Sequence, residues 1–112
     1  VCAMAASSGD PVAREILLRA GHELARTGVG AATALELGPR AAIARTGGVF
    51  SEPAVREAFE CEVSRLMPGA QTVEPRLPGS LGAALLALAE VGVQADGPVI
   101  DQMDRTWCTS PA

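Results

Sequence analysis

Hydrophobic residues recur at helical spacing in a long N-terminal stretch of the chain, which predicts an amphipathic helix. The stretch begins at Asp10-Pro11, where Asp is a good N-cap and Pro suits the first helical position. It continues to Leu37 and is stopped by Gly38-Pro39. Its buried face is predicted to consist of Val12, Ile16, Ala20 and Leu24.

A second amphipathic helix is expected to begin at Ser51-Glu52-Pro53, with Ser51 as its cap, and to end at Pro68-Gly69. Its core face is predicted to consist of Val55, Phe59, Val63 and Leu66. Its solvent face is predicted to consist of Arg56, Glu57, Glu60 and Glu62.

A third helix, Leu81 to Val91, is apolar nearly all round. Such a helix is expected to be buried against something larger than itself. From Gln94 onward the chain turns polar, and an irregular tail is expected over residues 94–112.

Two short apolar runs, Ala41–Thr46 and Ala70–Val73, are predicted to be strands. Because a helix joins them, they should lie parallel in a right-handed crossover. The predicted fold class is therefore α/β, in the order helix–strand–helix–strand–helix. Parallel sheets normally have several strands and cover on both faces. Residues 1–93 are therefore predicted to be the C-terminal part of a larger α/β lobe.

The composition of the 112 residues excludes several classes of function. The net charge is −4 and the basic residues, all Arg, form no cluster with aromatic residues, so nucleic-acid binding is not expected. No apolar run reaches the ~18 residues of a membrane span, and no signal peptide is visible. The chain starts at Val1 rather than Met, which predicts a fragment or a processed chain.

The three cysteines, Cys2, Cys61 and Cys108, are far apart and odd in number. This spacing argues against a disulfide framework and against a zinc site. A reducing, cytoplasmic location is expected.

The segment Thr46-Gly47-Gly48-Val49-Phe50 is the strongest candidate for a binding site. It lies between a predicted strand and a predicted helix, and glycine lets the backbone approach a nucleotide closely because it has no Cβ. The helix start at Ser51 adds N–H donors near the same place. The other interpretation is a plain strand-to-helix turn that binds nothing.

Three segments in this order resemble the C-terminal end of the BadF/BadG/BcrA/BcrD ATPase family, which includes the N-acetylglucosamine kinases. They are Gly9-Asp10-Pro11-Val12-Ala13, Thr46-Gly47-Gly48-Val49-Phe50 and Pro78-Gly79-Ser80-Leu81-Gly82-Ala83-Ala84-Leu85-Leu86-Ala87. The family belongs to the actin-like, sugar-kinase and Hsp70 ATPase superfamily, and the resemblance covers roughly Val1 to Val93.

The resemblance implies a two-lobed protein of ribonuclease-H-like topology that clamps ATP and Mg²⁺. Gly47 and Gly48 would then line the adenosine site, with Thr46 and Val49 as backbone neighbours. The family's phosphate loops and catalytic Asp have no counterpart in these residues. We therefore assign no catalytic residue and no metal ligand, and expect this chain alone to be inactive.

The intact protein is expected to transfer the γ-phosphate of ATP to a hydroxyl of an amino sugar such as N-acetylglucosamine. The sugar would bind in the part that is missing here, and a homodimer is left open as the assembly state. One alternative is an ATPase that activates a reductase or dehydratase, against which the lack of paired cysteines argues. Another is a non-enzymatic α/β module that packs on a partner through Leu81–Val91.

Overall fold

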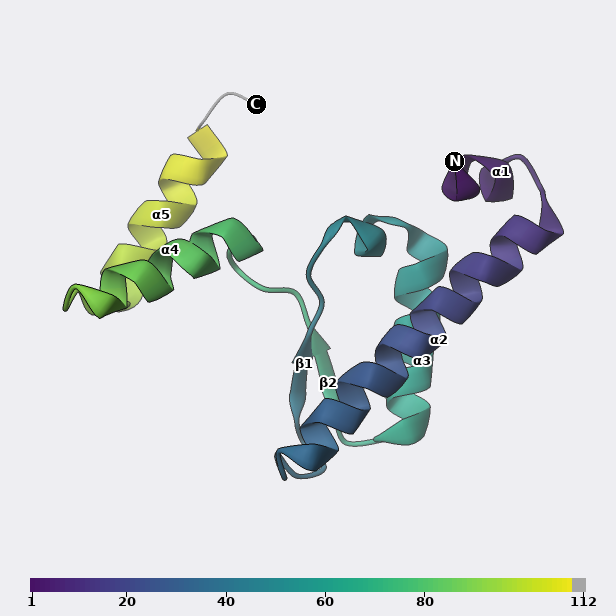
Figure 1. Ribbon diagram of the computed structural model, residues 1–112, viewed down its shortest axis with the longest axis horizontal. Helices are drawn as coiled ribbons and strands as arrows, with labels where there is room; N and C mark the ends of the chain where they lie inside the picture. The colour runs from purple at the N-terminus through teal and green to yellow at the C-terminus, as the bar shows by residue number, and fades with distance from the viewer. Residues whose placement is uncertain (110–112) are drawn as a thin grey trace. The chain divides into compact units, whose positions relative to one another are not determined.

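The computed structural model describes residues 1–109 and divides the chain into two compact units, with the boundary between Glu74 and Pro75. The first unit contains a short helix α1 (Cys2–Ser7), the long helix α2, the two strands and helix α3 (Figure 1). The second unit contains helices α4 and α5. A parallel strand pair with helices places the fold in the α/β class, as predicted.

Helix α2 spans Pro11–Ala34 and begins as the sequence predicts. The side chain of Asp10 accepts hydrogen bonds from the backbone N–H groups of Val12 (2.9 Å) and Ala13 (3.1 Å). The helix ends before the predicted Leu37. The backbone N–H of Leu37 instead donates a hydrogen bond of 3.1 Å to the carbonyl of Ala32, which closes the C-terminal end of the helix.

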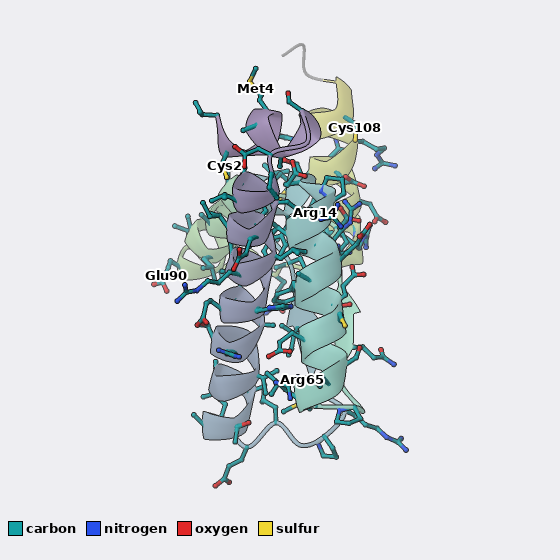
Figure 2. The ribbon with its side chains drawn as sticks, turned by 90° about the vertical axis from the view of Figure 1, so that its right-hand side faces the viewer. Cys2, Met4, Arg14, Arg65, Glu90 and Cys108 are labelled. Atoms are coloured by element: carbon teal, nitrogen blue, oxygen red, sulfur yellow. The ribbon has the colours of Figure 1, made fainter. Side chains whose placement is uncertain are left out.

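The buried face of α2 differs from the prediction. Helix α3 (Pro53–Leu66) packs along α2, and Figure 2 shows the two helices side by side, with Arg65 near the C-terminal end of α3. The buried positions of α2 are Ala13, Leu17, Gly21, Ala25 and Ala32. The predicted residues Val12 and Ile16 are 63% and 55% exposed, so the prediction for this face is wrong. The small residues are buried because they let the helices approach closely.

The core of the first unit is built on Ala25, Phe59 and Val63. Val55, Phe59 and Val63 are buried as predicted, whereas Leu66 is 37% exposed. The partly buried residues packed against this core are Val29, Ile43, Phe50 and Ala70. Strand β1, the residue just before the second strand and the segment before α3 are thereby held to the helix pair.

Strands β1 (Ala42–Ala44) and β2 (Gln71–Val73) pair in parallel, which confirms the prediction. In this register Ile43 lies opposite Thr72, and both are half-buried. Their neighbours along each strand are exposed, so only one face of the sheet is covered in the first unit.

The second unit contains α4 (Gly79–Glu90) and α5 (Gly97–Thr109). No residue of α4 is buried within this chain, and Leu86 is 72% exposed, so burial of α4 against a larger body stays a prediction. The prediction of an irregular tail from Gln94 is wrong over Gly97–Thr109, which form α5. Residues 110–112 of the predicted tail lie outside the described residues. Among the described helices, none has the length and apolar character needed to cross a membrane.

The start of α5 has a local cause. The side chain of Asp96 accepts a hydrogen bond from the backbone N–H of Val99 at 3.1 Å. Pro98 follows Gly97 in the first turn of the helix. This is the same combination of an Asp cap and an early proline that starts α2.

Candidate functional site

The candidate turn, Thr46 to Val49, directly follows the carboxyl end of β1. Pairing of the strands continues one residue past β1, because the backbone N–H of Arg45 donates to the carbonyl of Val73 at 3.0 Å. A 3₁₀-helix, η1 (Gly48–Ser51), then leads to α3. All four residues of the turn are exposed. In parallel α/β sheets, ligands bind at this carboxyl edge of the strands.

Gly47 and Gly48 have different conformational requirements. Gly47 has φ of 101° and ψ of 154°, a region that side-chain-bearing residues rarely adopt. Gly48 has no positive φ, and a Cβ built on it meets no atom within 4 Å. Gly47 is therefore required by the shape of the turn, whereas Gly48 leaves open space over the exposed backbone.

The far end of the turn is held by aromatic packing. The rings of Phe50 and Phe59 meet edge to face, with centroids 5.0 Å apart and an interplanar angle of 75°. The backbone N–H of Phe50 also donates to the carbonyl of Gly47 at 3.2 Å. Because Phe59 is a buried residue of α3, the turn is fixed relative to that helix.

The predicted cap of α3 is wrong. The N-cap is Glu52, whose side chain makes no capping hydrogen bond. The hydroxyl of Ser51 instead donates to the carbonyl of Gly48 at 2.6 Å. Ser51 therefore closes η1 next to the candidate turn, and does not cap α3.

A cavity of about 260 Å³ lies beside the start of α3. It is lined by Ala6, Ser7, Arg14, Leu18, Glu52, Pro53, Ala54 and Glu57. Two carboxylates and one guanidinium face it, so it carries no net attraction for an anion.

Glu62 lies on the predicted solvent face of α3 but is only 6% exposed, so this prediction is wrong. Its carboxylate accepts two hydrogen bonds of 2.8 Å from Arg65 and one of 3.4 Å from Arg26 on α2. The hydrogen bonds and charge of Arg65, followed by those of Arg26, lower the pKa of Glu62 from 4.5 to about 2. The cluster joins the two helices through Arg26 and Glu62.

The sequence pattern does not indicate that two charged residues near the candidate turn interact. Arg45 lies at the polar end of a predicted strand, and Glu60 lies on the predicted solvent face of a helix. The structure joins them in an ion pair of 2.9 Å, with the Arg45 side chain 15% exposed. Their separation of fifteen positions places the partner beyond any local spacing rule.

Within the described residues, no three His, Cys, Asp or Glu side chains are grouped as metal ligands. Comparisons with protein-family models, with curated proteins and with solved structures find no match to this chain.

Proposed function

We propose that this chain is the adenosine-binding, C-terminal part of an ATP-dependent amino-sugar kinase that resembles N-acetylglucosamine kinase. In this proposal the two parallel strands belong to a ribonuclease-H-like lobe, and the protein is cytoplasmic. The intact enzyme transfers the γ-phosphate of ATP to a sugar hydroxyl. This chain contributes one wall of the nucleotide site and none of the groups that carry out phosphoryl transfer.

The observation that carries the proposal is the geometry of the turn from Thr46 to Val49. Its residues are exposed at the carboxyl edge of a parallel strand pair, and Gly47 has a positive φ there. A flat purine or a ribose can lie against such a backbone, because neither glycine places a Cβ above it. These residues therefore fit the adenosine of ATP.

The triphosphate and Mg²⁺ do not fit the described residues in the same way. No group of three metal-ligating side chains is present within residues 1–109. Mg²⁺ needs oxygen ligands in a near-octahedral arrangement. In this proposal the metal, the phosphates and the sugar bind to the remainder of the enzyme.

Saturation-transfer NMR of ATP and adenosine with the full chain tests the proposal. A single wall is expected to bind with a Kd on the order of 1 mM. Saturation should reach the purine and ribose protons of both ligands. Tripolyphosphate should not compete with adenosine. The proposal is contradicted if neither ATP nor adenosine receives saturation from the protein.

Gly48→Val is the matched test of the site itself. A Cβ added at Gly48 meets no atom within 4 Å, so the fold is expected to remain intact while the valine fills the surface above the turn. The expected result is at least a tenfold (about 1.4 kcal/mol) loss of adenosine affinity. Gly30→Val is the control, because Gly30 also has no atom within 4 Å of an added Cβ but lies on α2. Equal affinities of the two variants would place the site elsewhere.

The second candidate is a non-enzymatic module that packs on a partner. It is favoured by the exposed apolar residues of the second unit, including Leu86 at 72% and Val91 at 75%. Exposed apolar patches are typical of interaction surfaces. Leu86→Glu separates the two functions: it should weaken association with a partner and leave adenosine binding unchanged. The ATPase-activator alternative gains no such support, because Cys2, Cys61 and Cys108 are separate free thiols.

A further inference from the structure

Arg45 occupies a fixed place at the end of β1. Its backbone is held by the hydrogen bond to Val73. Side chains alternate along a strand, so Arg45 lies on the same face as Ile43, the face that packs on the helices. The side chain of Arg45 is 15% exposed, whereas those of Arg26 and Arg65 are 56% and 62% exposed. Arg45 is therefore not an ordinary solvated arginine.

The guanidinium of Arg45 joins the strand end to α3. Its Nη1 lies 2.9 Å from Oε1 of Glu60. Its Nε is buried and has no hydrogen-bond partner within the described residues. Burial of a guanidinium with an unsatisfied donor is unfavourable. The arrangement therefore persists because the surrounding packing and the ion pair hold it.

The two ends of the candidate turn are attached to neighbouring residues of one helix. Arg45 precedes the turn and pairs with Glu60, and Phe50 follows the turn and packs on Phe59. Between these two anchors the turn is exposed. We infer that Arg45 is a positioning residue, whose ion pair with Glu60 holds the Gly47-Gly48 turn in the shape that receives adenosine. The link to adenosine rests on the proposed function, whereas the link to the shape of the turn does not.

A direct role of Arg45 in phosphate binding makes a different prediction. The charge of Arg45 is compensated by Glu60. If Arg45 bound phosphate, Glu60→Gln would free the guanidinium and strengthen binding of ATP relative to adenosine. If Arg45 positions the turn, Glu60→Gln should weaken binding of both ligands by the same factor.

Hydrogen exchange of the full chain tests the positioning role without any ligand. The amides to follow are those of Phe50 and Glu52, which donate to the carbonyls of Gly47 (3.2 Å) and Val49 (3.3 Å). In Glu60→Gln and Arg45→Met these amides should exchange on the order of fivefold faster than in the unmodified chain. The amide of Met67, at the end of α3, should not change. Arg45→Lys keeps the charge and should restore part of the protection.

Glu23→Gln is the matched control, because it removes an ion pair of 3.1 Å between Glu23 and Arg26, which both lie on α2. Exchange at Phe50 and Glu52 no faster than in this control would overturn the inference. A selective gain in ATP affinity in Glu60→Gln would also overturn it. If exchange responds as expected but the unmodified chain binds neither ATP nor adenosine, the proposed function fails and the anchoring of the turn by Arg45 stands.

Discussion

Gly21 is buried in the interface between α2 and α3, and Gly21→Ala tests whether small residues define that interface. A Cβ built on Gly21 would lie 2.5 Å from the carbonyl oxygen of Val55 and 2.7 Å from the Cβ of Ala58. Ordinary contact begins at 3.4 Å, so the helices would have to separate by almost 1 Å. Both neighbours are backbone or Cβ atoms, which cannot rotate away.

The expected cost combines two opposing terms. Overpacking of this kind costs about 1–3 kcal/mol, and the clash with backbone favours the upper end. Replacing Gly by Ala inside a helix stabilises the folded state by about 1 kcal/mol. The net loss is therefore about 1–2 kcal/mol in the free energy of unfolding, or a fall in Tm of roughly 4–16 °C.

Thermal unfolding followed by circular dichroism measures this difference. Gly30→Ala is the control, because it carries the same substitution in the same helix with no atom within 4 Å of the new Cβ. The control should be as stable as the unmodified chain or more stable. If Gly21→Ala is stabilised as much as Gly30→Ala, close approach of α2 and α3 does not depend on the missing side chain of Gly21.

Two further predictions concern charge and capping. The folded-state pKa of Glu62 is about 2 against an ordinary value of 4.5, so its ion pairs contribute stability above pH 4.5 that is lost as the pH falls toward 2. The free energy of unfolding of Glu62→Gln should depend less steeply on pH in that window. An unchanged dependence on pH would show that the ion pairs of Glu62 contribute nothing to stability. Asp10→Ala removes two capping hydrogen bonds and should lower the free energy of unfolding by about 1 kcal/mol in urea titrations, whereas Asp10→Asn should retain most of it. Equal losses in both variants would contradict a capping role.

The sequence predicts local structure well where a single residue decides it. Asp10 starts α2, and the two apolar runs form the parallel strand pair. Phe59 and Val63 are buried because a large apolar side chain at helical spacing gains most from leaving water. Asp96 caps α5 as Asp10 caps α2. The glycine that follows Asp96 disfavours a helix, so the start of α5 is not evident from the sequence.

The sequence does not show which face of α2 is buried. The stripe of larger side chains that includes Val12 and Ile16 and the stripe that includes Ala13 and Gly21 have the same helical spacing. Hydrophobicity favours the first stripe, whereas close approach of α3 selects the second. The choice depends on a tertiary contact, which the spacing of one helix does not contain.

The place of the Gly47-Gly48 turn between a strand and a helix was predictable from the sequence, but the contacts that hold the turn were not. Gly47 lies at a strand-to-helix turn, as its neighbours indicate, and its positive φ explains why a glycine occupies it. The ion pair of Arg45 with Glu60 and the burial of Glu62 depend on partners from other elements. Charge patterns along one helix report only neighbours three or four positions apart.

Mapping of backbone amide shifts during an adenosine titration is the sharpest test of whether the Gly47-Gly48 turn contacts adenosine. We expect the amides of Gly47, Gly48 and Val49 to shift together and to saturate with one Kd. These shifts should vanish in Gly48→Val but persist in Gly30→Val. Shifts confined to other residues, or no shift at the turn at saturating adenosine, would show that adenosine does not bind there.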